Sequence, residues 1–426
     1  MFYCECKKIG RSIPFLLYVA VMLLVFFSQA PFPSKVEPPA PGQESYSRYG
    51  HVYTDDPDDI VPVALETLYY EFTNNQFTTY PIGFYKSVKL GDEDRKAVAE
   101  IFSGLLEGMS AEELLMAAPM EYPPGAMIHQ PDGKGGFELI PPPVTVELTP
   151  AELPYDRFQA EMAKIDKVLG GGSDYDEKGL RAMSRRSLSY EEAAEQYRLF
   201  QSEDRYSGGY ARLFADYLVI FATVMPVFIA VSEGMRDRRA RMRELIWSRR
   251  ASAAAITFSR FFAIAALCMI PILVFAVIDT FYVLSLHPGE SIDLLAFFRQ
   301  SFMWVLPGIL ISTAVGMLLT ELTDTPIAIL VMGIWWLLSL NGAATLVGNY
   351  VVDLFTLIPR HNSKSATGIY LQGLRNLVLN RCFYAGLAVV LTALAAFILS
   401  RKRKGRWPTY DSIKAAIRNR KVRTEV

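Results

Sequence analysis

The most regular feature of the chain is a set of apolar runs long enough to cross a lipid bilayer. A transmembrane helix needs about 20 mostly apolar residues. Six runs come close to this length or exceed it, at residues 13–30, 211–232, 253–286, 298–320, 326–346 and 381–400. The sequence therefore predicts a mainly α-helical membrane protein with six transmembrane helices.

Two of these runs allow more than one interpretation. Residues 13–30 follow a basic segment and end in Ser28-Gln29-Ala30, as in a cleavable signal peptide. Because further spans follow, we expect an uncleaved anchor. Residues 253–286 contain Pro271 and, at about 1.5 Å per residue, exceed the hydrocarbon thickness. We therefore expect this helix to tilt, to kink or to project from the bilayer.

Charge divides the chain into two populations. Residues 31–210 hold 31 acidic and 16 basic residues, whereas the remainder holds 13 acidic and 27 basic residues. The overall net charge of −1 is therefore a cancellation. Such an asymmetry indicates that the two parts have different surroundings.

Lys and Arg in the flanking segments predict the orientation, because cytoplasmic segments carry an excess of them. The basic segments are residues 1–12, 233–252 and 401–426. With six spans, all three lie in the cytoplasm, and both termini do so too. The acidic domain at 31–210 and the segment at 347–380 then lie outside. The latter carries Arg360, Lys364, Arg375 and Arg381, which the rule does not favour there, so we expect it to be re-entrant or interfacial.

The acidic domain is predicted to be mostly helical. Asp92 starts a helix that runs to about Met109, and Ser110 with Glu113 three residues later is a capping-box pattern. Further helices are expected at residues 149–168, ended by Gly170, and at 189–204, the latter continuing into the second span. Residues 144–148 read as a short strand.

Signatures of catalysis and metal binding are missing from the sequence. The four histidines are scattered, and the H-E-x-x-H, G-x-S-x-G and G-x-x-x-x-G-K-[ST] motifs do not occur. We expect no enzyme, no metal or cofactor bound by this chain, and no nucleic-acid partner. Cys4 and Cys6 form a C-x-C before the first span; metal binding or lipid attachment is one interpretation, and two ordinary thiols is the other.

The segment at 233–252 joins the second and third spans and carries many arginines. Its middle should be helical, with Met242, Leu245 and Ile246 forming an apolar edge. Cytoplasmic orientation alone explains the charge but not this edge. The other interpretation is a short interfacial helix that docks into a partner, and these residues alone leave both open.

This segment resembles that of the permeases of ABC-2 type ABC transporters, in which a Glu-containing segment leads through basic residues to a Glu-Leu-Leu-like step. The usual proline is replaced here by Arg250-Ala251. The large insertion after the first span, the six spans and the polar turn at 320–324 add to the resemblance. The matching residues are Glu233, Arg238, Arg239, Glu244-Leu245-Ile246, Ser248 and Ser252.

The resemblance implies an export-type permease half in the plasma membrane. A second copy or a paralogue would complete the pathway, and a separate cytoplasmic ABC ATPase would bind the loop and hydrolyse the ATP. The residues that this implies for ATPase coupling are Glu233, Arg238, Arg239, Glu244, Leu245 and Trp247.

Charged residues within the spans are further functional candidates, because charge in hydrocarbon is costly. Asp279 either contacts a polar substrate in the pathway or lies at the interface, and Arg260 is expected to extend to the headgroups. Two other functions stay open. One is a membrane-anchored receptor or immunity protein whose outer domain binds a ligand. The other is an ion-coupled secondary transporter, which the lack of internal repeats disfavours.

Overall fold

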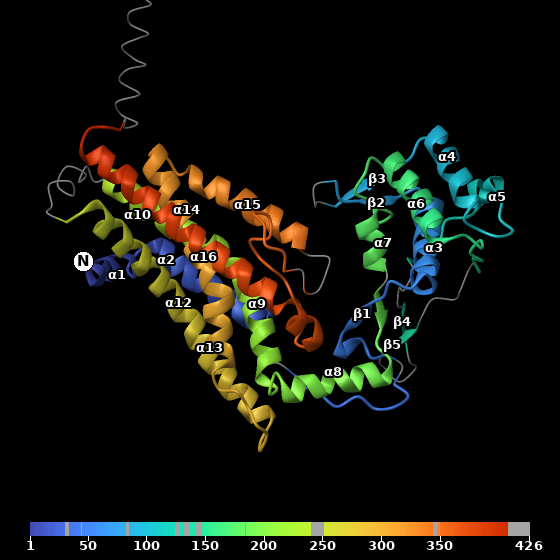
Figure 1. Ribbon diagram of the computed structural model, residues 1–426, viewed down its shortest axis with the longest axis horizontal. Helices are drawn as coiled ribbons and strands as arrows, with labels where there is room; N and C mark the ends of the chain where they lie inside the picture. Colours follow the sequence, from blue (N-terminus) through green and yellow to red (C-terminus); the bar gives the residue numbers. More distant parts are fainter. Residues whose placement is uncertain are drawn as a thin grey trace, which may run out of the picture. The chain divides into compact units, whose positions relative to one another are not determined.

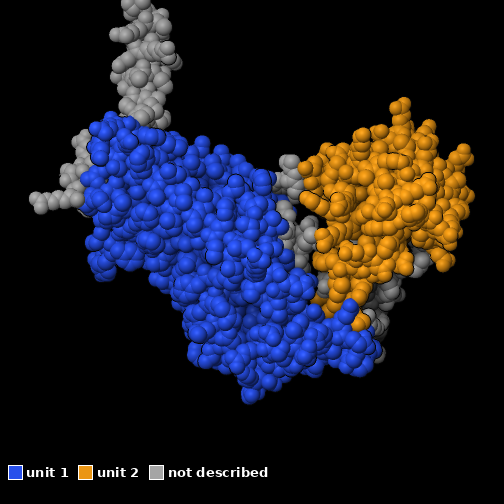
Figure 2. Space-filling view, in the orientation of Figure 1, with its two compact units in different colours: residues 1–43, 190–426 blue, residues 44–189 orange. Residues whose placement is uncertain are grey.

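The structure is a computed structural model of the 426-residue chain. It describes residues 1–29, 34–43, 45–81, 85–123, 128–131, 137–140, 147–183, 185–239, 251–343, 348 and 350–407. Within this part, the chain divides into two compact units (Figure 2). Unit 1 comprises residues 1–43 and 190–426, and unit 2 comprises residues 44–189.

Unit 1 is built from helices (Figure 1). In its described part they are α1 (Phe2–Ile9), α2 (Ile13–Gln29), α8 (Tyr190–Ser202), α9 (Ser207–Val224), α10 (Pro226–Arg239), α12 (Ala253–Leu286), α13 (Ala296–Gln300), the π-helical turn η2 (Ser301–Val305), α14 (Leu306–Thr323), α15 (Ile327–Ala343) and α16 (Thr367–Arg403).

Apolar length marks several of these helices as membrane spans. Four helical stretches in the described residues are long and apolar enough: Ser207–Arg236, Ala253–Leu286, Ala296–Thr323 and Thr367–Arg403. The pair α1 and α2, bent by 69°, makes a fifth if it is counted as one span. Helix α15 is apolar but shorter. The chain is therefore a multi-pass membrane protein, and the sixth crossing stays a prediction.

Helix α14 is central to unit 1 and packs against α9, α10, α12, α15 and α16. Glycines on α14 permit the close approach of its neighbours. A Cβ at Gly308 would lie 2.2 Å from Oγ1 of Thr223 in α9, and one at Gly316 would lie 2.7 Å from Cβ of Ala230 in α10. Such small residues suit helix packing in membranes, where backbones must come close to gain dispersion energy.

Several helix boundaries differ from the sequence prediction. The helix expected to run from Asp92 to about Met109 ends at Ser103, and the one expected at residues 149–168 begins at Tyr155. Helix α8 does not continue into the second span, because Arg205 and Tyr206 adopt positive φ angles of 46° and 61° that break the helix before α9. The predicted division between an outer segment at 347–380 and a span at 381–400 is also not observed, because α16 is continuous from Thr367. The N-terminal part of α16 carries the polar and basic residues that made this part of the chain look separate from the span.

Unit 2 combines helices with two-stranded antiparallel ribbons, which pair β1 with β6, β2 with β3 and β4 with β5. In its described part the elements are η1 (Ser47–Tyr49), β1 (His51–Tyr53), α3 (Pro57–Thr73), β2 (Phe77–Thr79), β3 (Lys86–Val88), α4 (Asp92–Ser103), α5 (Ala111–Met116), β4 (Ile128–Pro131), β5 (Phe137–Ile140), α6 (Tyr155–Leu169), α7 (Glu177–Met183) and β6 (Arg185–Ser187).

The core of unit 2 lies between α3, α4 and α6 and is apolar, with Leu68, Phe72, Phe102 and Ile165 fully buried. The predicted capping box is confirmed: Ser110 and Glu113 bond reciprocally at the start of α5. The predicted stop at Gly170 is confirmed as well, by its left-handed conformation at the end of α6. Most of the predicted strand at 144–148 lies outside the described residues.

One polar group is enclosed at the edge of this core. Glu71 is 4% exposed, accepts a hydrogen bond of 2.6 Å from the Tyr175 hydroxyl and accepts another of 2.8 Å from the Thr78 backbone N–H. Burial nevertheless raises the pKa of Glu71 above its usual range. This carboxyl is therefore a source of pH dependence in unit 2.

Candidate functional site

The end of α10 carries the first predicted coupling residue, Glu233, whose side chain is 1% exposed. Its carboxylate forms an ion pair with Lys8 of α1 and another, of 3.4 Å, with Arg236 of its own helix. A buried carboxylate is stable only when it is paired. The N-terminal helix α1 is therefore part of the site at the end of α10.

A second ion pair attaches α1 to α12. Arg260 Nε lies 3.7 Å from Oε2 of Glu5, and both side chains are largely buried. We expected Arg260 to extend to the lipid headgroups; instead it has a protein partner. Because α1 also packs along α12, this short helix connects the end of α10 to the beginning of α12.

Helices α14 and α16 join the same end of the bundle. A Cβ at Gly234 would lie 2.7 Å from Cγ2 of Thr320, so α10 and α14 touch there. The buried ammonium of Lys402, on α16, lies 3.2 Å from Oδ1 of Asp324 and 3.5 Å from Oε1 of Glu321. It also donates to the Glu321 carbonyl.

The consequence is a continuous set of contacts. The second half of α1, the beginning of α12 and the ends of α10, α14 and α16 lie together. Arg403 adds a hydrogen bond of 2.8 Å to the Ala251 carbonyl at the start of α12. We call this set the inner cluster: Glu5, Lys8, Glu233, Arg236, Arg260, Glu321, Asp324 and Lys402. A displacement of α10 at this end cannot occur without disturbing its neighbours.

The N-terminal end of α9 holds a polar network separate from the inner cluster. The guanidinium of Arg212 makes two hydrogen bonds of 3.0 Å to the Asp204 carboxylate and lies over the Tyr370 ring at 4.5 Å. Thr367, the first residue of α16, donates to the same carboxylate at 2.6 Å. This network anchors the N-terminal end of α16 to the start of α9.

Two of the basic residues that conflicted with the predicted orientation, Arg360 and Arg381, have internal partners. Arg360 pairs with the fully buried Asp216 at 2.9 Å, and the backbone N–H of His361 donates to the same carboxylate at 2.8 Å. Arg381 donates to the Leu357 carbonyl at 2.8 Å and to Asn380. A charge neutralised or satisfied within the protein does not report cytoplasmic orientation in the way that a free flanking Lys or Arg does.

Asp279 lies in α12 and is 2% exposed, and its Oδ1 has no hydrogen-bond partner among the described residues. It shares a helix face with Phe275, Val283 and His287, which are spaced by four residues. Phe275 stacks on Phe26 of α2 with ring centroids 4.4 Å apart. Asp279 therefore faces the helix bundle, and its role in a pathway stays a prediction.

The remaining predicted coupling residues lie at the end of α10 and beyond it. Arg238 and Arg239 lie in the last turn of α10, and Glu244, Leu245 and Trp247 fall outside the described residues. Sequence reasoning missed two ion-pair partners, Lys8 for Glu233 and Lys402 for Asp324. The partners are 225 and 78 positions apart, and nothing in the local sequence signals contacts over such separations. Among the described residues, no group of three His, Cys, Asp or Glu side chains could hold a metal.

Comparison with known proteins gives one informative match. The family described as "ABC-2 family transporter protein" matches residues 163–399, which is more than half of the chain. The match includes α9 to α15 and most of α16, and therefore most of the inner cluster. No curated protein and no solved structure matches the chain.

Proposed function

Because the chain belongs to the ABC-2 family of transporter proteins, and is thus the membrane component of an ABC transporter, we propose that it is the permease subunit of an ATP-driven exporter. A separate cytoplasmic ABC ATPase supplies the ATP hydrolysis, and a second copy or a paralogue completes the pathway. The observation that carries this proposal is the inner cluster, which links the helix preceding the arginine-rich loop to four other helices.

The proposed topology has six crossings, with the inner cluster at the cytoplasmic face and both termini cytoplasmic. Two observations support this orientation. The basic N-terminus, the start of the arginine-rich loop and the basic end of α16 gather at one end of the bundle. The basic residues Arg360 and Arg381, assigned to the other end, are engaged within the protein. Unit 2 then lies outside the cytoplasm.

The proposed coupling is mechanical. The ATPase binds the loop at 240–250 through the apolar edge that includes Leu245 and through Glu244 and Trp247. Closure of the ATPase pair displaces the loop and with it the end of α10. Glu233 passes the displacement to α1, and the contact of Gly234 with Thr320 passes it to α14. Because these helices are packed, they respond as rigid bodies that switch between two arrangements.

The test is a double variant in the loop, Glu244→Ala with Leu245→Ala. We expect the complex with the ATPase to weaken and ATP-dependent transport to be lost. The matched control is Arg249→Ala with Arg250→Ala, which removes charge from the same loop but keeps the apolar edge. Normal complex formation and normal transport in the first variant would overturn the assignment of these residues.

The same experiment separates the proposal from the receptor alternative. A receptor that uses its helices only as an anchor does not require an ATPase, so neither loop variant would alter ligand response. Loss of the complex and of ATP-dependent transport in the first variant is therefore specific to the transporter function.

A further inference from the structure

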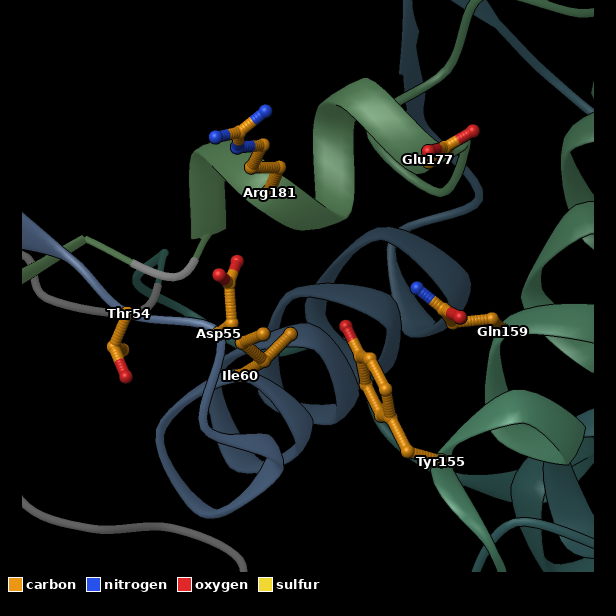
Figure 3. Close-up of a pocket in the computed structure, with 7 residues that line it drawn as sticks. All are labelled: Thr54, Asp55, Ile60, Tyr155, Gln159, Glu177 and Arg181. Atoms are coloured by element: carbon orange, nitrogen blue, oxygen red, sulfur yellow. The ribbon is translucent and has the colours of Figure 1, made fainter.

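Unit 2 contains a hollow of about 250 Å³ that the transport proposal does not use (Figure 3). It lies where the end of β1, the helices α3 and α6, and α7 come together. Its lining is Thr54, Asp55, Ile60, Tyr155, Gln159, Glu177 and Arg181. Only Ile60 is aliphatic, and it is buried, so the hollow offers one apolar contact among polar groups.

Local structure fixes the positions of the lining groups. The Asp56 carboxylate caps α3 by accepting from the Asp58 N–H at 3.1 Å, and the Thr54 hydroxyl accepts from the Asp56 N–H at 2.9 Å. This turn places Asp55 at the mouth of the hollow. Glu177 and Arg181 are four residues apart on α7 and so share one helix face.

The two carboxylates of the lining are not used to hold unit 2 together. In the described part of the chain, the carboxylates of Asp55 and Glu177 form no ion pair and accept no hydrogen bond, whereas those of neighbouring acidic residues do. Asp59 pairs with Arg186 at 3.8 Å, and Asp176 accepts from the Gly179 N–H at 2.6 Å. Asp55 and Glu177 are thus available to a ligand.

Tyr155 supplies the third recognition element. Figure 3 shows its hydroxyl and the Asp55 carboxylate directed into the space beneath α7. Burial raises the pKa of the Tyr155 phenol; a hydrogen bond from Gln159 opposes this rise, and the negative charge of Asp55 adds to it. The ring stacks on Phe158 with centroids 6.1 Å apart, which holds it in place.

We propose that this hollow binds an organic ammonium compound, with Asp55 and Glu177 receiving the charge and Tyr155 offering its hydroxyl and ring face. Carboxylates and an aromatic ring are the groups that favour a cation. The acidic excess of residues 31–210 raises the local concentration of cations around the hollow. Arg181 opposes the charge of the ligand and so limits the affinity for a simple amine.

The probe is 1,5-diaminopentane, and the measurement is saturation-transfer NMR on the full-length protein in detergent. Saturable binding is expected below about 10 mM, a modest affinity suited to an open polar site. The uncharged isostere 1,5-pentanediol should not bind. All variants change exposed side chains, so they are expected to fold.

Each variant has a distinct expected outcome. Asp55→Asn and Glu177→Gln should each weaken binding about fivefold, and Arg181→Gln should strengthen it about twofold to fivefold. The control, Asp92→Asn with Glu93→Gln, removes two charges from unit 2 at the exposed start of α4 and should change binding less than twofold.

Three results would overturn the proposal. They are the absence of saturable binding, equal binding of the diol, and an equal loss in the α4 control, which would show attraction by the acidic surface alone. The proposal concerns unit 2 and does not depend on the transport function. Failure of one leaves the other intact.

Discussion

The ion pair between Lys8 and Glu233 makes the inner cluster testable. Lys8→Met removes the cation while keeping an unbranched side chain of similar length. Among the described residues, it leaves Glu233, at 1% exposure, with only the mostly exposed Arg236 at 3.4 Å. A carboxylate that stays buried after losing its main partner destabilises the folded state.

The magnitude follows from burial. Breaking a fully buried pair costs about 3–5 kcal/mol, whereas an exposed pair is worth about 0–1 kcal/mol. Lys8 is 24% exposed and Glu233 almost fully buried, so the loss lies between these limits, at about 2 kcal/mol. For a protein of this size, this lowers the midpoint of thermal unfolding by about 2–4 °C.

The assay compares Lys8→Met with Lys7→Met in detergent. Lys7 is exposed on the same helix and is a charge-matched control. Hydrogen exchange should accelerate in α1 and at the end of α10 in the first variant only. Adding Glu233→Gln to Lys8→Met should recover part of the lost stability, because the unpaired charge is removed. Equal behaviour of the Lys7 and Lys8 variants would refute the reasoning.

Three further predictions concern other parts of the fold. The pKa of Glu71 is raised in the folded protein, so its contribution to stability is full below the pKa of the unfolded state and is lost as pH rises through the pKa of the folded state. Glu71→Gln should abolish this loss. Hydrogen exchange in α3, compared between the two proteins at pH 4.5 and 8, measures it. Gly209→Ala should destabilise unit 1 by about 1–3 kcal/mol, because the new Cβ would clash with a backbone carbonyl oxygen. The control Gly333→Ala places its Cβ where nothing lies within 4 Å and should not destabilise it. Equal midpoints of thermal unfolding for the two variants would contradict this. Lys402→Met should lower the free energy of unfolding by about 2–3 kcal/mol, because it leaves the buried carboxylate of Asp324 without its cation. The control Lys404→Met changes an exposed side chain and should lower it little, as thermal unfolding of both variants would show.

Local patterns predicted much of the helical structure. Apolar length located the spans, and the Ser110 and Gly170 signals located helix ends, because each depends on residues within a few positions. The family resemblance rested on the loop after Glu233 and agrees with the family match.

Contacts between distant residues could not be predicted in this way. Asp216 and Arg360 are 144 positions apart, and each alone looks like an isolated charge near a span end. The stretch before Arg381 was expected to be re-entrant or interfacial and separate from the last span, because its charged residues show no partner in the sequence. In the structure Asn380 and Arg381 bond to backbone carbonyls, and this allows α16 to run through them.

The central claim is that the loop after α10 contacts a cytoplasmic ATPase. The most direct measurement replaces Trp247 with the photo-crosslinking residue p-benzoylphenylalanine and identifies the crosslinked protein in membranes from the native host. The account predicts a crosslink to a protein with a Walker motif, which diminishes in the Glu244→Ala, Leu245→Ala background. Crosslinking only to proteins without an ATPase domain would contradict it, as would labelling of a Trp247→Cys variant at that cysteine by a membrane-impermeant maleimide in intact cells.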